Sequence, residues 1–173
     1  MRLQNPFAAL SPTGLDSQIL TVLSRSSATL TIPEIHRLLP ETGSEPGVRV
    51  ATARLVDQGV VTELGMGRAR GYTLNRRHLL AGAIDLIASA LPRLLTSIAE
   101  DVNRWPEPPI SVMIFGSAAR GTMRADSDID LLIVAPDHAE GAALESLVSA
   151  LALDTAPPTG NDDRPLVYTE SEN

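Results

Sequence analysis

The sequence predicts an α/β (α+β) chain made of two modules, a mainly helical one followed by one built on a short mixed sheet. Apolar residues recur at helical spacing through most of the first half, whereas the second half contains short apolar runs of strand length. Charge is divided in the same way: residues 1–80 carry nine arginines and six acids, and residues 81–173 carry five arginines and fifteen acids. Such asymmetry indicates modules with different partners, and we expect domains at residues 1–77 and 78–173.

The first module shows start and stop signals for three helices. After an irregular lead-in over residues 1–13, apolar residues at helical spacing over 15–23 predict the first helix. Residues 31–34, Thr-Ile-Pro-Glu, predict a capping box that opens the second. Ser44 precedes a third helix, which is expected to end at Gln58–Gly59 because glycine readily adopts the left-handed cap conformation.

A basic, glycine-rich connection over residues 65–70 joins two short strands, 60–64 and 71–74, which we expect to pair as a hairpin. With an extended piece at Thr29–Leu30, this order of elements resembles a winged helix-turn-helix domain. The resemblance implies that the helix over about residues 45–58 enters the major groove of double-stranded DNA. The arginines expected to contact DNA are Arg49, Arg54, Arg68 and Arg70. The alternative is that these arginines are solvated surface and that the module mediates protein contacts or dimerisation.

The second module opens with a long helical pattern from Leu80 to Ile98, which Pro92 is expected to kink or divide. A proline-rich segment beginning at Trp105 then predicts a rigid linker. The elements expected beyond it are a strand at 110–115, a turn into a helix at 116–121, a strand at 127–134, a helix at 138–151, a loop at 155–161 and an edge strand at 165–169.

Acidic residues at alternate positions interrupt the strand expected at 127–134. Asp128 and Asp130 project from one face of such a strand, about 7 Å apart. Two carboxylates in an apolar strand are costly unless their charge is compensated, and carboxylate oxygens are ligands that Mg²⁺ accepts. Gly116–Ser117 opens the preceding helix, where glycine lets the backbone approach a ligand and free N–H groups attract phosphate. Arg120 either holds phosphate or braces this turn.

These residues resemble the signature of the minimal nucleotidyltransferases of the DNA polymerase β-like superfamily. The resemblance rests on residues 115–121, Phe-Gly-Ser-Ala-Ala-Arg-Gly, and 127–131, Ser-Asp-Ile-Asp-Leu. It implies transfer of a nucleoside monophosphate, commonly AMP, from ATP or another nucleoside triphosphate to an acceptor hydroxyl, with Mg²⁺ as cofactor. The expected site residues are Gly116, Ser117, Arg120 and Ser127 for nucleotide binding, and Asp128 and Asp130 for metal binding and catalysis.

One feature of the resembling family is not evident. Its members usually supply a third carboxylate from a following strand, which here would be residues 163–170, Asp-Arg-Pro-Leu-Val-Tyr-Thr-Glu. Only the ends of this strand, Asp163 and Glu170, are acidic. The family's third acid often serves as a base, so its absence bears on turnover. Many relatives also continue with helices that hold the acceptor, which suggests a trimmed or minimal form here.

The sequence thus predicts a magnesium-dependent nucleotidyltransferase that modifies a protein or RNA hydroxyl and is localised or regulated by a DNA-binding module. Resemblance to toxin–antitoxin components implies a cognate toxin as a partner. The alternative is a DNA-binding transcription regulator whose second domain senses nucleotide or is inactive. Transfer to a small molecule such as an aminoglycoside ranks last, because the chain offers little acceptor pocket after the final strand.

Composition limits the remaining functional classes. The chain has no cysteine, which excludes disulfides and thiolate metal sites. It has no apolar run of membrane-spanning length and no signal-peptide pattern, so we expect a cytoplasmic protein without membrane attachment. Fold analogy alone suggests a homodimer.

Overall fold

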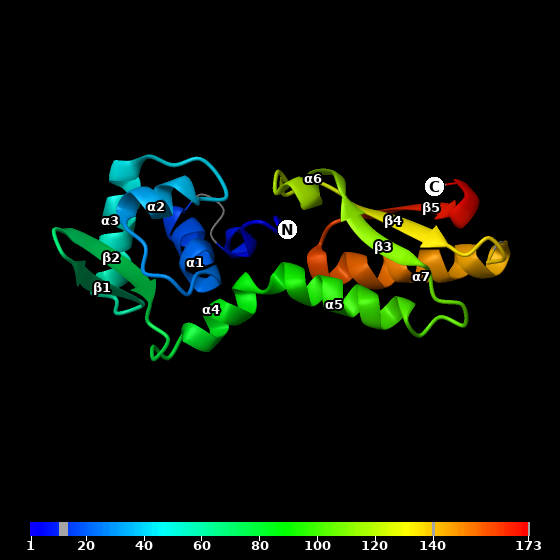
Figure 1. The fold of residues 1–173 in the computed structure, drawn as a ribbon, viewed down its shortest axis with the longest axis horizontal. Helices are drawn as coiled ribbons and strands as arrows, with labels where there is room; N and C mark the ends of the chain where they lie inside the picture. Colours follow the sequence, from blue (N-terminus) through cyan, green and yellow to red (C-terminus); the bar gives the residue numbers. More distant parts are fainter. Residues whose placement is uncertain (11–13, 140, 173) are drawn as a thin grey trace. The chain divides into compact units, whose positions relative to one another are not determined.

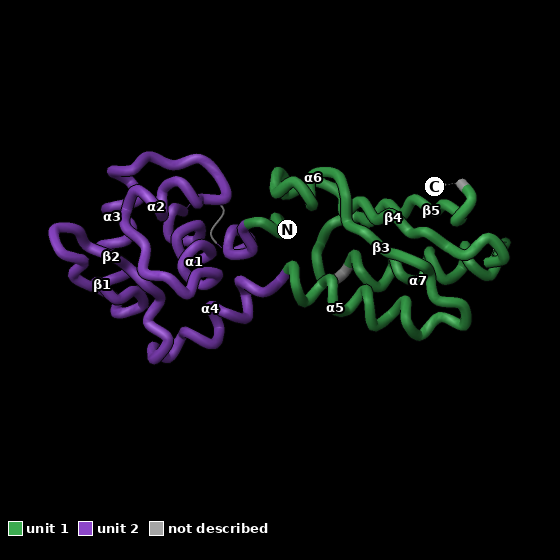
Figure 2. Tube along the Cα trace, viewed as in Figure 1, with its two compact units in different colours: residues 1–4, 91–173 green, residues 5–90 purple. Residues whose placement is uncertain are grey.

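The computed structural model describes residues 1–10, 14–139 and 141–172, and the chain divides into two compact units (Figures 1 and 2). One unit comprises residues 5–90, and the other comprises residues 1–4 and 91–173. The division falls later than the predicted boundary after residue 77. Helix α4 (Ala81–Ala88) accounts for the difference, because its buried Ile84 and Ala88 belong to the core of the first unit.

The first unit is mainly helical and ends in a hairpin and a helix. Its elements are η1 (Pro6–Ala9), α1 (Leu15–Arg25), α2 (Ile32–Arg37), α3 (Glu45–Asp57), β1 (Val61–Met66), β2 (Ala69–Leu74) and α4. Strands β1 and β2 pair antiparallel, and Leu30 forms a single bridge with Tyr72 of β2. Helices α1 to α3 and strands β1 and β2 lie close to the places predicted from sequence, whereas η1 lies in the lead-in that was predicted to be irregular. Residues 11–13 of the lead-in lie outside the described residues. That the unit is a winged helix-turn-helix stays a prediction.

Local hydrogen bonds explain where the helices of this unit begin and end. The backbone N–H and the hydroxyl of Thr31 both donate to Glu34 Oε2, at 2.8 and 2.7 Å, at the start of α2. Ser44 Oγ accepts a hydrogen bond from the backbone N–H of Gly47 at 3.2 Å and so caps α3. Gly59, with φ of +72°, lies one residue beyond the C-cap residue of α3, in a conformation that favours glycine.

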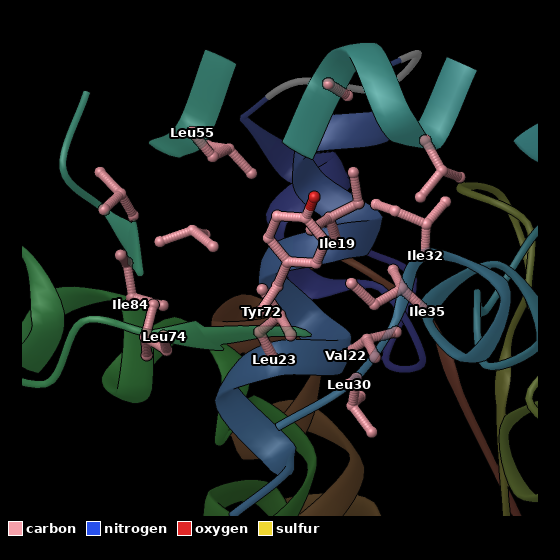
Figure 3. Packing of buried hydrophobic residues seen from close by; sticks show 14 of the residues in the cluster. Ile19, Val22, Leu23, Leu30, Ile32, Ile35, Leu55, Tyr72, Leu74 and Ile84 are labelled. Atoms are coloured by element: carbon pink, nitrogen blue, oxygen red, sulfur yellow. The ribbon is translucent and has the colours of Figure 1, made fainter. Parts of the chain in front are cut away.

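A single apolar core holds the first unit together (Figure 3). Ile19 of α1, Ile35 of α2 and Val48 of α3 are fully buried. Tyr72 of β2 and Ile84 of α4 pack into the same cluster. Every helix and the hairpin of this unit therefore contribute to one core, including α4, which lies at the start of the acidic half of the chain.

The second unit contains the mixed sheet that the sequence predicts. Its elements are α5 (Ala90–Val102), β3 (Ser111–Phe115), α6 (Gly116–Arg120), β4 (Ile129–Ala135), α7 (Ala142–Thr159), β5 (Asp163–Thr169) and η2 (Glu170–Glu172). Strand β4 is central, with β3 antiparallel on one side and β5 parallel on the other. The parallel pair is joined through α7, as parallel strands require a crossover.

Helices α5 and α7 both cover one face of this sheet (Figure 1). On that face the alternate residues Ile129, Leu131 and Ile133 of β4 are fully buried. Residues of the opposite face are more exposed: Met113 and Leu166, which lie level with each other across the sheet, are 46% and 47% exposed. The uneven cover makes one face of the sheet a core and leaves the other partly exposed to solvent.

Two helices differ from their predicted bounds. The long helical pattern is divided, but at Ser89, so that Pro92 falls in the first turn of α5, where its missing N–H costs little. The predicted loop at residues 155–161 is wrong, because α7 continues to Thr159. The hydroxyls of Thr155 and Thr159 donate to backbone carbonyls four residues earlier, and Gly160, with φ of +66°, ends the helix.

Within the described residues, no single helix is long and apolar enough to cross a membrane, and only α4 and α5 taken together as a bent pair reach that length and composition.

Candidate functional site

Gly116 lies directly against the carboxylate of Asp130. Phe115, the last residue of β3, pairs with Asp130 of β4, and Gly116 follows it with φ of +65°. A Cβ atom at position 116 would lie 2.0 Å from Asp130 Oδ2. Glycine is therefore required twice, once for the left-handed backbone and once for the close approach. The Gly116 turn and the predicted catalytic carboxylate of Asp130 thus lie in contact at the end of the sheet.

A single helical turn, α6, carries the other residues of the predicted phosphate-binding turn. Ala118 anchors it, being only 5% exposed and part of the sheet's core. Gly121, with φ of +68°, ends it, and the backbone N–H of Thr122 donates to the Ser117 carbonyl at 3.0 Å. Ser117 is half-buried beside Gly116, whereas Arg120 is exposed at the last position of the turn.

Asp128 stands immediately before β4, which begins at Ile129, so the prediction that it lies inside the strand is wrong. Its neighbours nevertheless hold it firmly. Asn161, which is 5% exposed, donates from Nδ2 to the Ser127 carbonyl at 2.7 Å. The backbone N–H of Ile129 donates to the Asp162 carbonyl at 2.8 Å. Sequence reasoning missed Asn161, because an asparagine after a glycine is also typical of an ordinary turn.

Ser127, predicted to bind nucleotide, forms two hydrogen bonds with the backbone of Arg124 in this loop. Its hydroxyl accepts a hydrogen bond from the backbone N–H of Arg124 at 2.9 Å. The backbone N–H of Ser127 donates in turn to the Arg124 carbonyl at 3.3 Å. These bonds close the turn that precedes Asp128 and the start of β4. The nucleotide contact of Ser127 stays a prediction.

Arg164 is a second residue of this site that sequence reasoning missed. It pairs in register with Asp130 across β4 and β5, and its Nε lies 2.8 Å from Asp128 Oδ2. The Arg164 side chain is 71% exposed and that of Asp128 is 27% exposed. The sequence did contain a signal for it. In the strand Asp-Arg-Pro-Leu-Val-Tyr-Thr, residues 163–169, Arg164 lies in the stretch where the resembling family usually has an acid.

The acids at the two ends of β5 do not join Asp128 and Asp130. Asp163 pairs with the fully buried Ile129 and so lies level with the helix-covered face of the sheet. Burial raises the pKa of Asp163 to about 6; the nearby Thr155 hydroxyl offsets part of this increase, and the Asp162 carboxylate adds to it. Glu170 follows Thr169, the partner of Ala135, at the opposite end of the parallel pair.

The candidate ligands for a magnesium ion at this site are two carboxylates, Asp128 and Asp130. Among the described residues, no group of three or more His, Cys, Asp or Glu side chains could hold a metal. Asp128 and Asp130 are two oxygen-bearing groups, and the first is already ion-paired with Arg164. Mg²⁺ is commonly bound by one or two carboxylates together with substrate phosphates and water, so these two residues would hold the predicted ion when a triphosphate is bound.

Three of the four arginines predicted to contact DNA form ion pairs inside the first unit. Arg49 lies 3.0 Å from Glu45, Arg54 lies 2.8 Å from Asp16, and Arg70 lies 2.8 Å from Glu63. Arg68 follows Gly67 at the tip of the hairpin and is exposed. All of these arginine side chains are well exposed, and exposed ion pairs of this kind are weak, at about 0–1 kcal/mol.

Comparison with known families found one match, and it lies in the second unit. Residues 95–162 match the model of the nucleotidyltransferase domain family. The matched segment runs from α5 to the end of α7 and includes the Gly116 turn, Asp128 and Asp130, while β5 lies outside it. The match supports a nucleotidyltransferase domain in the second unit, and with it nucleotidyl transfer as a general activity. Searches among curated proteins and among solved structures found no match.

Proposed function

We propose that this protein transfers a nucleoside monophosphate, AMP in the first instance, from a nucleoside triphosphate to a hydroxyl group of a protein or an RNA. The observation that carries the proposal is the contact of Gly116 with Asp130, beside Asp128, inside the segment that matches the nucleotidyltransferase family. A turn suited to phosphate and a pair of carboxylates are both needed to activate a phosphoryl centre and an attacking hydroxyl.

The chain's own residues account for two parts of the reaction. The backbone N–H groups of the Gly116 turn and the Ser117 hydroxyl bind phosphate oxygens, with Arg120 as a further cation near the turn. Asp130 has no ion-pair partner among the described residues and accepts the proton of the attacking hydroxyl. The acceptor oxygen then bonds to the α-phosphorus, the bond from the α-phosphorus to the bridging oxygen breaks, and pyrophosphate leaves.

We further propose that the first unit binds double-stranded DNA through Arg49, Arg54, Arg68 and Arg70, and that it localises or regulates the transferase. The order of helices and hairpin, together with weak ion pairs that phosphate can replace, supports this role. A regulated transferase of this kind suits one half of a toxin–antitoxin pair, with a cognate toxin as the protein partner and a homodimer as the assembly.

A second function is favoured by one observation, the pairing of Arg164 with Asp128. A cation in the place of a third acid suits a domain that binds a nucleotide without transferring it. In that case the protein is a DNA-binding transcription regulator whose affinity for DNA responds to nucleotide.

The test is a transfer assay with each of the four nucleoside triphosphates labelled at the α-phosphate, with Mg²⁺ and a cell extract as the source of acceptors. We expect labelled product with the wild type and with Asp126→Asn, an exposed acid in the same loop. We expect none with Asp128→Asn or Asp130→Asn. Binding of nucleotide without transfer, together with a nucleotide-dependent change in DNA affinity, would select the second function instead.

A further inference from the structure

The open end of the sheet brings together two acids and one cation. Asp128 and Asp130 come from the head of β4, and Arg164 comes from the head of the edge strand β5. The guanidinium Nε lies 2.8 Å from Asp128 Oδ2, within the range of a charge-assisted hydrogen bond. This ion pair lies at the site itself, unlike the exposed ion pairs of the first unit.

The register of β5 determines that this third residue is a cation. Directly paired residues of parallel strands project from the same face, so Arg164 shares a face with Asp130, and Asp163 shares a face with Ile129. The bond from the Ile129 N–H to the Asp162 carbonyl, at 2.8 Å, holds this register. A shift of one residue would exchange Arg164 for Asp163 and create a cluster of three carboxylates.

We propose that Arg164 is a built-in counter-cation that competes with a divalent metal ion for Asp128 and keeps cation binding weak in the absence of nucleotide. This inference rests on the proposed function, since it concerns how the same site acquires its cation. Arg164 is a positioning residue here, because it acts through Asp128. A divalent ion that binds Asp128 must first displace the guanidinium, and the two positive charges repel each other at close range.

The expected change in divalent-cation affinity depends on how exposed the ion pair of Arg164 and Asp128 is. Arg164 is largely exposed and Asp128 only partly so, which places the pair between a surface ion pair and a buried one. Loss of the guanidinium should therefore tighten divalent-cation binding about three- to tenfold, and high salt should reduce the difference.

The experiment titrates the full chain with Mn²⁺ at low ionic strength, without nucleotide, and follows the electron paramagnetic resonance signal of free Mn²⁺. We expect Arg164→Gln to bind Mn²⁺ about three- to tenfold more tightly than the wild type. Arg93→Gln, which removes the same charge from an exposed position of α5, should bind it as the wild type does. Arg164→Asp, which places a third carboxylate level with Asp130, should bind it more tightly still.

A double variant separates competition for Asp128 from a general effect of charge. In the Asp128→Asn background, the further change Arg164→Gln should bring no gain in Mn²⁺ affinity, because the contested carboxylate is absent. The proposal is overturned if Arg164→Gln binds Mn²⁺ no better than the wild type, if Arg93→Gln gains as much, or if the gain persists without Asp128. Should Arg164→Gln not fold, Arg164→Met keeps the aliphatic stem and makes the same comparison.

This measurement is independent of the transfer assay. It uses neither triphosphate nor acceptor, so a tighter Mn²⁺ site in Arg164→Gln upholds the counter-cation even if the wild type transfers no nucleotide. Transfer by the wild type with unchanged Mn²⁺ affinity in Arg164→Gln would uphold the proposed function and reject the counter-cation.

Discussion

Gly116 is the single residue on which the geometry of the site depends most directly. Its φ of +65° favours glycine, and the Asp130 carboxylate occupies the space that a Cβ atom would need. Sequence reasoning assigned it to phosphate binding from its place in a Gly-Ser turn. The structure adds a second reason for glycine, the contact with Asp130, which no local pattern reveals.

Gly116→Ala should therefore lower nucleotide affinity at least tenfold and the free energy of unfolding by about 2–4 kcal/mol, through backbone strain and displacement of Asp130. Gly160→Ala is the matched control: its φ is +66°, but nothing lies within 4 Å of the added Cβ, so only strain of about 1 kcal/mol is expected. Urea unfolding followed by the fluorescence of Trp105, the single tryptophan and part of the same core, measures the free energy of unfolding of both variants. Equal losses in the two variants would show that the contact with Asp130 has no role.

Asp163 gives the stability of the second unit a pH dependence. Burial raises the pKa of this carboxyl from 3.8 to about 6, and the nearby Thr155 hydroxyl offsets only part of the increase. Between these two values the folded chain holds a proton that the unfolded chain has released. The contribution of Asp163 to stability is therefore most favourable below pH 3.8 and falls as the pH rises to about 6.

Asp163→Asn should raise the free energy of unfolding at pH 7 by about 1–2 kcal/mol, and the gain should vanish below about pH 4. Asp154→Asn, an exposed acid on α7, should change stability little at either pH. Urea midpoints at pH 4, 5, 6 and 7 provide the comparison. A gain that does not depend on pH would place its cause elsewhere than in ionisation of Asp163.

Among the elements, the first four residues belong to the second unit although they begin the chain. Leu3 is fully buried in the core beneath the sheet, and Gln4 donates from Nε2 to the Met123 carbonyl at 2.8 Å. The lead-in that shows little periodicity thus includes a structural segment. A segment this short has too few residues for a period to be recognised, so only tertiary packing could reveal its role.

Leu3→Ala should lower the free energy of unfolding of the second unit by about 2–4 kcal/mol, as expected when a buried leucine is truncated. Leu10→Ala, at a position 75% exposed in the same stretch of sequence, should change it by less than about 0.5 kcal/mol. Trp105 fluorescence during urea unfolding reports on the relevant core. Indistinguishable midpoints for the two variants would mean that residues 1–4 do not stabilise this unit.

For the whole molecule, the distribution of charge governs any encounter with nucleic acid. The net charge is −7, and the excess of acids lies after residue 80. Binding to DNA would have to rely on the arginines of the first unit against repulsion from the rest of the chain. Such binding depends strongly on salt, because each phosphate contact releases counterions.

Arg68→Ala, at the exposed hairpin tip, should weaken DNA binding at low salt and reduce the salt dependence by about one released counterion. Arg93→Ala, an exposed arginine of the second unit, serves as the control and should leave both unchanged. Fluorescence anisotropy of a labelled duplex across a salt series measures these quantities. If the wild type shows no salt-dependent binding, the alternative in which this module mediates protein contacts becomes the better one.

What the sequence determined by itself is the set of local features. The Thr31 to Glu34 cap, the basic hairpin, the Gly-Ser turn and the acids at 128 and 130 were all recognisable, because each depends on residues within one or two turns of the chain. Only the tertiary structure decided which residue of β5 lies beside Asp130. Strand register depends on pairing between residues more than thirty positions apart and on which face is buried, and this is why Arg164, and not an acid, completes the site.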